Sequence, residues 1–306
     1  MLIEEKLSRV KPQRDTALTV GVFDGVHRGH RSLIARLNQE AAAAGLDSGV
    51  VTFQHHPRLV LKAHSHITRL TSLQERITLL ERAGVKHVVP LSFTPDVSQL
   101  SAREFVELLR RYLRMRALII GPDFALGKAR KGDTAALEAL GQELGFTVEA
   151  VPPMVMNGEA ISSTAIRKAL AEGDIRKATE FLGRHFSLQG QVARGDSRGK
   201  TLGFPTANIV PEQGQALPAD GVYAVRVYAG GEAHRAVANI GLRPTFGSEE
   251  RLLEVHLLGF DGDLYGQEIE VEFIDRLRDE VRFSDAEQLK VQVMKDIEQA
   301  GAILER

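Results

Sequence analysis

The first half of the sequence alternates short runs of β-branched and apolar residues with longer segments of helical periodicity. Strand-like runs at Leu18 to Phe23 and Gly49 to Phe53 flank a helical pattern from about Arg31 to Ala44. The order repeats downstream, with helices expected at 72–83, 102–112 and 134–144 and strands at 87–91, 117–121 and 147–151. Strands that alternate with helices in this way form a parallel sheet with crossover helices. We therefore expect a doubly wound α/β domain.

After Gly183 the pattern changes, because strand-like segments are separated by glycine turns instead of helices. These segments lie at 221–228, 235–240, 252–258 and 268–273. Such spacing predicts a small antiparallel β-barrel. A C-terminal helix is expected from about Ser284 to Glu298, with Ser284 and Glu287 forming a capping box at its start. The change of pattern places the domain boundary near His185, giving domains at 1–184 and 185–306.

Composition excludes several classes of protein. The chain of 306 residues carries 40 acidic and 39 basic side chains, so its overall charge calls for neither nucleic acid nor a membrane surface as a partner. Its start, MLIEEKLSRV, lacks the features of a signal peptide, and no apolar run approaches the length of a membrane span. The absence of cysteine excludes disulfides, thiolate catalysis and cysteine-based zinc sites. We expect a two-domain cytoplasmic protein with no obligate protein partner.

The segment GVFDGVHRGH, from Gly21 to His30, follows a strand of buried character and opens a helix. The end of such a strand and the N-terminus of the helix together favour an anion. Glycines let the backbone approach a phosphate closely, and His27 and His30 can donate to the same phosphate oxygens from one face of the first helical turn. The dinucleotide fingerprint GxGxxG is absent. The segment predicts a phosphate site, and the alternative is a pair of ordinary surface or half-buried histidines.

Two other segments suggest a site by residue type alone. The histidine-rich stretch 55–66 lacks carboxylates at metal-ligand spacing, so solvated loop histidines are expected there in preference to a metal centre. The segment GDSRGKT has three residues between Gly195 and the triplet Gly199-Lys200-Thr201, whereas a P-loop requires four, and no helical pattern follows. We therefore expect neither a metal site at 55–66 nor a P-loop at 195–201.

The glycine and histidine segment resembles the HxGH signature of the nucleotidyltransferase superfamily, and its longer form GxFDGxHxGH resembles the bacterial FAD synthetases. The resemblance implies a Rossmann-like HxGH domain. It further implies that His27 and His30 stabilise negative charge on the α-phosphate of ATP while FMN attacks in line, without a covalent intermediate.

Three later segments, FQHHP, GPDFALG and ISSTAIR, are similar to motifs of the same family and occur in the family's order. In GPDFALG, Asp123 would position the FMN or its metal, and Phe124 would offer an apolar face to the flavin. In ISSTAIR, Ser163 and Thr164 would cap a helix and bind phosphate, and Arg167 would grip the polyphosphate. The nucleotide contacts implied for the N-terminal domain are Gly21, Phe23, Asp24, Gly29, Ser163, Thr164 and Arg167.

In the C-terminal half, LGFPTAN resembles the flavokinase signature. The resemblance implies that Thr206 and Asn208 hold the Mg²⁺ of MgATP, with ATP supplying further oxygen ligands, and that Gly199 belongs to a glycine loop over the nucleotide. It extends through GVYAV, NIGLRPTF and EVHLLGFDGDLYG. Glu254, the first residue of the last segment, matches the glutamate that accepts the proton of the riboflavin 5′-hydroxyl. Candidates for contact with phosphate or flavin are Arg243 and Arg278.

These motifs span roughly residues 15 to 298 and predict a bifunctional enzyme. It would phosphorylate riboflavin to FMN and adenylylate FMN to FAD, releasing pyrophosphate, with riboflavin, FMN and ATP as its ligands. The chain departs from the family's pattern at Gln54, Leu126 and Gly259, of which Leu126 weakens flavin stacking at its position. One alternative is an enzyme with a single intact site. The other is a regulatory protein that senses flavin or binds RNA, which the low aromatic content of 6% disfavours.

Overall fold

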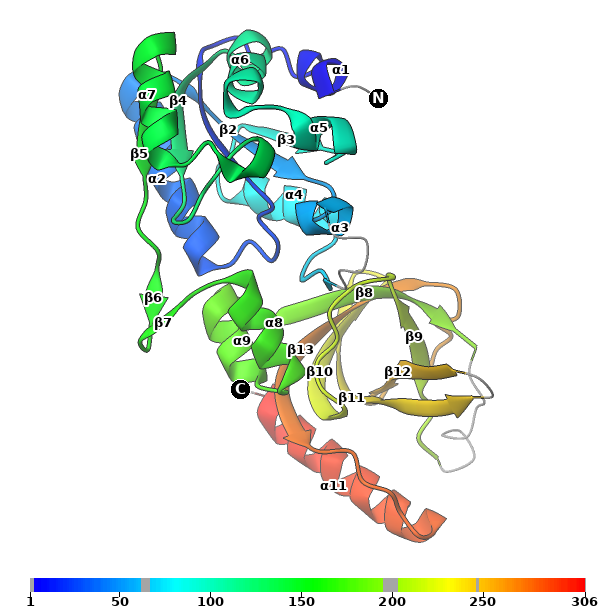
Figure 1. The fold of residues 1–306 in the computed structure, drawn as a ribbon. Coiled ribbons are helices and arrows are strands. Elements are labelled where there is room, and N and C mark those ends of the chain that lie inside the picture. Colours follow the sequence, from blue (N-terminus) through cyan, green and yellow to red (C-terminus); the bar gives the residue numbers. More distant parts are fainter. Residues whose placement is uncertain (1–2, 62–66, 195–202, 246–247, 306) are drawn as a thin grey trace. The chain divides into compact units, whose positions relative to one another are not determined.

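The computed structural model describes residues 3–61, 67–194, 203–245 and 248–305, and the chain divides into two units, Met1–Ser163 and Thr164–Arg306 (Figure 1). Each unit has its own sheet and its own apolar core. No helix in the described ranges combines the length and the apolar character that crossing a bilayer requires.

The N-terminal unit is built on a parallel sheet in the order β3-β2-β1-β4-β5. Apolar residues fill both faces of its central strands, as expected for a sheet with helices on each side. The predicted doubly wound domain is thus confirmed. The strands are β1 (Thr16–Gly21), β2 (Asp47–Phe53), β3 (His87–Leu91), β4 (Met115–Ile120) and β5 (Thr147–Ala150).

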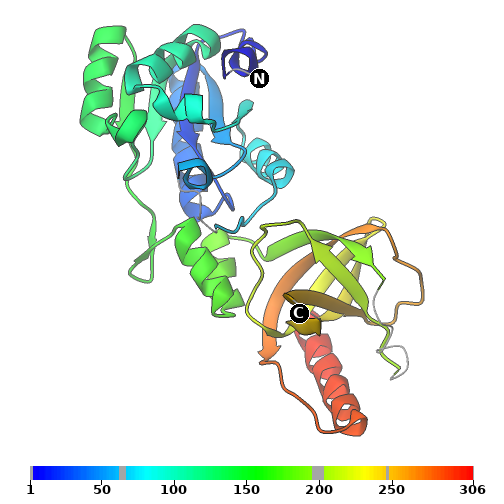
Figure 2. The ribbon, with the colours of Figure 1, turned by 45° about the vertical axis from the view of Figure 1, so that its right-hand side comes forward.

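Helices cover the two faces of this sheet (Figures 1 and 2). Leu18 packs in a core with side chains of α1, α6 and α7, whereas the neighbouring Ala17 packs in a second core with α2 and α4, because successive residues of a strand point to opposite faces. The helices are α1 (Ile3–Ser8), α2 (Arg28–Ala44), α3 (Pro57–Leu61), α4 (Leu73–Arg82), α5 (Pro95–Gln99), α6 (Ala102–Leu113) and α7 (Thr134–Leu144). A 3-10 turn, η1 (Lys128–Arg130), and a hairpin of β6 (Val155–Met156) and β7 (Glu159–Ala160) complete the unit.

The strand order locates the ligand-binding edge of the sheet. The order reverses beside β1, whose neighbours are β2 on one side and β4 on the other. Loops that leave the carboxyl ends of β1 and β4 diverge to opposite faces, and open α/β sheets bind ligands in the crevice formed there. The segments at this point are Gly21–His30 after β1 and Gly121–Gly127 after β4.

The C-terminal unit contains a closed antiparallel barrel in the order β10-β11-β12-β9-β8-β13, which confirms the predicted fold. Two of its strands, β8 and β9, are not among the predicted ones. Tyr223, Val225 and Val227 of β10 are fully buried, while the alternate residues Val222 and Ala224 pack against the C-terminal helix. The elements are α8 (Ser163–Ala171), α9 (Ile175–Leu182), β8 (Phe186–Ala193), β9 (Ala207–Pro211), β10 (Gly221–Ala229), β11 (Glu232–Thr245), β12 (Ser248–Leu257), β13 (Glu268–Arg278) and α11 (Ala286–Leu304).

The predicted capping box of the last helix is wrong. Helix α11 begins at Ala286, and Asp285 is its N-cap, accepting a hydrogen bond of 2.9 Å from the amide of Gln288. Ser284 instead donates to the Asp285 carboxylate. The carboxylate one residue later satisfies the free amide of the first turn, so Ser284 and Glu287 have no capping role.

An ion pair fastens α11 to the barrel. The guanidinium of Arg278, at the end of β13, donates to both carboxylate oxygens of Asp296 over 2.8 to 3.1 Å, and Gln292 donates to the same carboxylate at 2.9 Å. Asp296 is only 3% exposed. Arg278 was predicted to contact phosphate or flavin, and in this structure its guanidinium is occupied by Asp296.

Replacing Asp296 by alanine is expected to destabilise the C-terminal unit by about 3 kcal/mol, because it leaves a partly buried guanidinium without its carboxylate. Urea unfolding followed by tyrosine fluorescence measures the change, since three of the four tyrosines, Tyr223, Tyr228 and Tyr265, lie in this unit. Glu305→Ala is the control, because Glu305, the C-cap of α11, forms an exposed ion pair with Arg235 of β11 that contributes about 0–1 kcal/mol. Equal effects of the two changes would contradict the assigned role.

Candidate active sites

The loop after β1 has a constrained backbone. β1 ends at Gly21, two residues before the predicted end, and φ is positive at Phe23 (53°), Gly25 (83°) and Val26 (38°). Positive φ is costly for residues with a Cβ and persists where the surroundings hold it. The Phe23 ring is only 2% exposed and packs in the core beneath the loop. The loop is therefore a fixed turn that delivers the chain to the start of α2.

His27 and His30 lie together at the start of α2. His27 is the N-cap, with its Nδ1 accepting a hydrogen bond of 3.3 Å from the amide of His30. The two rings stack with centroids 3.6 Å apart and an interplanar angle of 17°. Because Nδ1 of neutral His27 is an acceptor, its proton resides on Nε2, which can donate to a ligand. The pairing of these side chains agrees with the sequence-based expectation.

The surroundings of His30 hold its imidazole neutral. Burial of the ring lowers its pKa well below the ordinary 6.5, and protonation of His27 and the charge of Arg76 lower the pKa further. A neutral imidazole donates from one nitrogen only. Arg76, which sequence analysis did not select, is thereby part of the electrostatic environment of this site.

Asp24 has its side chain turned into the protein. Its carboxylate accepts hydrogen bonds from the amides of Leu70 at 3.0 Å and Thr71 at 3.2 Å, and its carbonyl oxygen accepts one of 2.8 Å from the hydroxyl of Ser163. The residue is 3% exposed. Two residues predicted to contact ATP, Asp24 and Ser163, thus bind each other and join the glycine loop to the start of the ISSTAIR helix.

Gly29 marks a close approach between the same two segments. A Cβ built on this residue would lie 3.2 Å from Nδ1 of His27 and 3.3 Å from the carbonyl oxygen of Ile161. Such distances are tighter than most real Cβ contacts, so a side chain here would push the His27 ring or the Ile161 backbone. Gly29 therefore allows the histidine pair and the ISSTAIR segment to come together.

The loop after β4 is also fixed by its own contacts. Asp123 is exposed with φ of 55°, and its carbonyl oxygen accepts a hydrogen bond of 2.6 Å from Arg130. Phe124 is half-buried against the core, and Leu126 is buried and paired with Gly132 by two backbone hydrogen bonds of 2.9 Å. Leu126 is therefore a core residue and not a surface for stacking.

The remaining predicted site residues are located by their elements. Thr164 and Arg167 lie on α8, in the C-terminal unit by the division given above. Gly199, with the rest of the glycine segment, lies outside the described residues, as do His64 and His66. Arg243 lies on β11, and its side chain is outside the described part.

In the C-terminal unit, the strand register brings polar residues into one row. Asn208 of β9 lies directly opposite Glu254 of β12, which in turn lies opposite Asn239 of β11. Directly opposed residues of antiparallel strands point to the same face, so the three side chains share a face of the barrel. Sequence analysis selected Asn208 and Glu254 but gave Asn239 no role, because its place beside Glu254 depends on the register of two strands.

This row belongs to the outer face of the barrel, on the side of α11. Val237 packs in the core with Ala300 and Leu304 of α11, and Asn239, two residues further on, points the same way. His256 lies directly opposite Val237 and donates from Nδ1 to the carbonyl oxygen of Pro205 at 2.8 Å. The outer barrel face that carries Asn208, Glu254 and Asn239, called the Glu254 face below, is thus continuous with the face that α11 covers.

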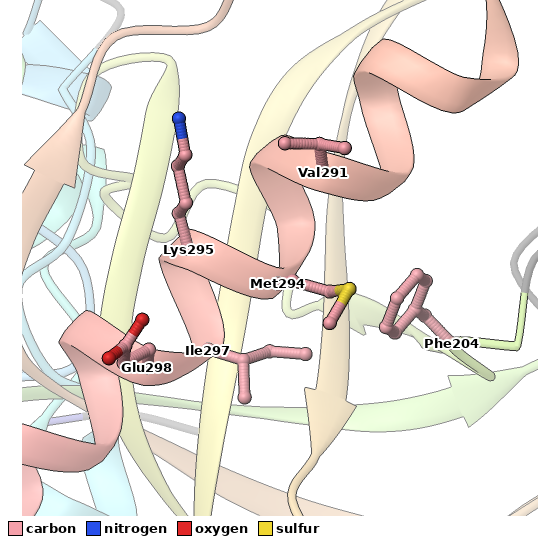
Figure 3. A pocket seen from close by; sticks show the side chains of 6 residues that line it. All are labelled: Phe204, Val291, Met294, Lys295, Ile297 and Glu298. Atoms are coloured by element: carbon pink, nitrogen blue, oxygen red, sulfur yellow. The ribbon is translucent and has the colours of Figure 1, made fainter.

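An apolar hollow of about 660 Å³ lies between α11 and the segment that leads into β9. Figure 3 shows Met294 and Ile297 directed toward the ring of Phe204. That ring also meets the His256 imidazole edge-on, with centroids 5.9 Å apart. Met294 is 57% exposed, so an apolar wall stands open beside the row of Asn208, Glu254 and Asn239.

A second, smaller hollow of about 120 Å³ contains Thr206. Its other walls are Val192, Val255 and Leu257 of the barrel and the loop Phe260–Tyr265. Among the described residues, no three His, Asp or Glu side chains gather as a metal site. The oxygen donors near the end of the loop 203–206 are the hydroxyl of Thr206 and the amide of Asn208, which are ligands that suit a hard cation.

Comparisons with known proteins match each unit to a protein family. A family model described as FAD synthetase matches residues 9–165, and one described as riboflavin kinase matches residues 182–304. The fold and the two sites therefore define an enzyme with two flavin-related transferase modules. The chain belongs to the bifunctional riboflavin kinase/FMN adenylyltransferase family. It is an enzyme with both activities, as predicted from the sequence.

Individual relatives cover nearly the whole chain. The protein of that name from Escherichia coli (strain K12) is 41% identical over 93% of this chain and 91% of its own length. The Haemophilus influenzae protein is also 41% identical, over 94% of this chain and 93% of its own length. The Pseudomonas fluorescens protein is 39% identical over 99% of this chain and 98% of its own. A solved structure described as a macrolide-efflux protein from Streptococcus pneumoniae is 32% identical, with a TM-score of 0.89 over 95% of each chain.

Proposed function

We propose that the N-terminal unit adenylylates FMN at the histidine pair. The observation that supports this best is the stacked pair His27 and His30 at the start of α2, at the point where the strand order reverses. Ring nitrogens there can donate to the α-phosphate of ATP as its charge grows in the transition state. FMN phosphate attacks in line, pyrophosphate leaves, and no protein nucleophile is required.

The other residues predicted to contact ATP or flavin at this site have different proposed roles, according to what surrounds each of them. Gly21 and Gly29 let the backbone approach the phosphates, while Phe23 and Asp24 shape the loop from beneath. Ser163 holds the loop through Asp24, and Thr164 and Arg167 contact the polyphosphate. Asp123 and Phe124 face the flavin from the loop after β4.

For the C-terminal unit we propose phosphorylation of riboflavin with Glu254 as the general base. Its carboxylate accepts the proton of the 5′-hydroxyl as that oxygen attacks the γ-phosphate of ATP. The shared face of Asn208, Glu254 and Asn239 supports this role, because it places the base beside a metal-binding residue and an amide that can orient it.

The Mg²⁺ of MgATP would be held by Thr206 and Asn208. Bound there with the phosphate oxygens, it would neutralise charge that develops on the transferring phosphoryl group. The smaller hollow around Thr206 would border the nucleotide, and Gly199 is proposed as a further ATP contact. Arg243 contacts phosphate or flavin.

The flavin ring of riboflavin fits the larger apolar hollow. Flavin rings are flat and apolar on both faces, and the hollow offers Phe204, Met294 and Ile297 beside the Glu254 face. The ribityl chain would then run from the hollow toward Glu254. Arg278, although predicted as a flavin contact, supports this wall indirectly by fixing α11 through Asp296.

The proposed ligands are riboflavin, FMN and ATP, and the proposed location is the cytoplasm. Incubation of the purified protein with riboflavin and MgATP, followed by chromatography of the flavins, tests the function directly. Both FMN and then FAD are expected. Formation of FMN without FAD would contradict the role proposed for the histidine pair. Absence of FMN would contradict the role proposed for Glu254.

A domain boundary at 184/185 is also proposed. The contacts of α8 and α9 with the barrel suggest a test that compares two fragments. Helix α9 packs against β8 and β13, Arg176 pairs with Asp275 at 2.6 Å, and the amide of Ala219 donates to the carbonyl oxygen of Leu170. The fragment 186–306 is expected to phosphorylate riboflavin but to unfold at lower urea concentration than the fragment 164–306, because it lacks these contacts. Equal midpoints would show that α8 and α9 contribute nothing to the barrel.

A further inference from the structure

A buried charge of the N-terminal unit has no role in the proposed chemistry. Arg76 lies on α4, and its side chain is 2% exposed. Removing a guanidinium from water is costly unless its donors are well paired. Arginines of this kind are therefore retained where the charge itself is needed or where it holds a network together.

The hydrogen-bond donors of Arg76 are only partly used, although the side chain forms a long ion pair with Asp24. Nη1 donates to the carbonyl oxygen of Phe53 at 2.7 Å, and Nη2 lies 3.9 Å from a carboxylate oxygen of Asp24, beyond hydrogen-bond distance. Nε has no hydrogen-bond partner among the described residues. The Asp24 carboxylate is itself occupied by the amides of Leu70 and Thr71.

The position of Arg76 connects it to the phosphate site. Phe53 is the last residue of β2, and Asp24 belongs to the loop after the neighbouring β1, so the guanidinium lies under the carboxyl edge of the sheet. The charge of Arg76 contributes to the lowered pKa of His30, after burial of the ring and protonation of His27. A buried charge acts over several ångströms because neither water nor salt screens it fully.

The histidines alone do not supply a positive charge. His27 accepts at Nδ1, and the ring of His30 is neutral in this environment, so both act as dipolar donors. A triphosphate nonetheless carries several negative charges, which these two neutral imidazoles alone attract weakly. We propose that Arg76 is the buried fixed cation that attracts the phosphates of ATP to the His27 and His30 site.

This inference rests on the proposed adenylyltransferase role of that site. Arg76 does not touch the nucleotide and acts through its field. The alternative is a purely structural role, in which its hydrogen bond to Phe53 ties β2 to the loop. The two roles differ in what a lysine can replace, because lysine keeps the charge but not the planar fork of donors.

The test follows the imidazole signals of His27 and His30 by nuclear magnetic resonance while inorganic pyrophosphate is added to the full chain. His30→Ala assigns the signals. Arg76→Met is expected to raise the pyrophosphate concentration needed to shift them by about 10-fold or more. Arg76→Lys is expected to stay within about threefold of the parent. Arg82→Met, an exposed arginine on the same helix, is the control and is expected to change nothing.

Two further readouts separate charge from structure. The KM for ATP in FMN adenylylation is expected to rise in Arg76→Met with little change in the KM for FMN. The pKa of His30 is expected to rise in Arg76→Met but not in Arg76→Lys, while His27, whose protonation also lowers this pKa, is unchanged in both variants. A structural role would instead impair both variants equally.

Unchanged pyrophosphate titration in folded Arg76→Met would overturn the inference, and so would equal loss in both variants. If Arg76→Met does not fold, the pyrophosphate affinity of Arg76→Lys tests the inference. A folded lysine variant that binds pyrophosphate much more weakly than the parent would show that the charge of Arg76 is not what attracts the phosphates. A parent protein that binds pyrophosphate but makes no FAD would refute the proposed function alone, because the titration needs no turnover.

Discussion

Replacing His30 by alanine is expected to lower FAD formation from FMN by about 10²-fold or more, while FMN formation from riboflavin continues at the parent rate. The change removes one of the two side chains that we propose as donors to the α-phosphate, and the effect of such a donor is greatest in the transition state. The second activity survives because Glu254, Thr206 and Asn208 lie in the other unit. Chromatography of flavins from separate reactions with FMN and with riboflavin measures both rates.

His87→Ala is a matched control in the same unit. His87 is the first residue of β3, at the edge of the sheet opposite the glycine loop, and it contacts Asp47 at 3.2 Å. We expect this variant to keep both activities. If His30→Ala made FAD at the parent rate, or if His87→Ala lost as much activity, the assignment of His30 would be wrong.

Replacing Glu254 by glutamine is expected to lower phosphorylation of riboflavin by about 10²-fold or more, because the amide is nearly isosteric with the carboxylate but cannot accept the proton. MgATP binding is expected to change little, since the proposed metal contacts are Thr206 and Asn208. FAD formation from supplied FMN is expected to survive, because His27 and His30 remain in place.

The control for this variant is Glu270→Gln, a half-buried glutamate on β13 of the same barrel. It removes a strand carboxylate without touching the row of Asn208, Glu254 and Asn239. Kinase activity is expected to stay near the parent level. Retained kinase activity in Glu254→Gln would remove this residue from the mechanism, and parallel loss of both activities would indicate misfolding.

The sequence was sufficient to predict the elements that carry a strong period. Both faces of β1 and β2 are buried, and the resulting apolar runs, separated by helical patterns, predict a parallel sheet. The glycine loop was also predictable, because Gly21, Gly29 and the histidine spacing are local features. Gly259, a departure from the family's pattern, has φ of 68°, which a turn with glycine accommodates without strain.

Features that depend on distant contacts were not predictable. Asn239 acquires its place beside Glu254 only through strand register, and Arg76 resembles any helical arginine until its burial is known. The short strand β9 has no alternation long enough to identify it. At α11 the capping pattern indicated Ser284, whereas the structure has Asp285 as the cap, because the sequence alone does not determine which side chain reaches the free amide.

The stacking of His27 on His30 has a consequence in acid. Rings this close repel when both are charged, so a charge on His27 opposes protonation of His30. Because the pKa of folded His30 lies below 6.5 and that of an unfolded histidine lies near it, the unfolded chain binds more protons as the pH falls. The N-terminal unit therefore loses stability on acidification from about pH 6.5 downward, and above that pH the pair imposes no such loss.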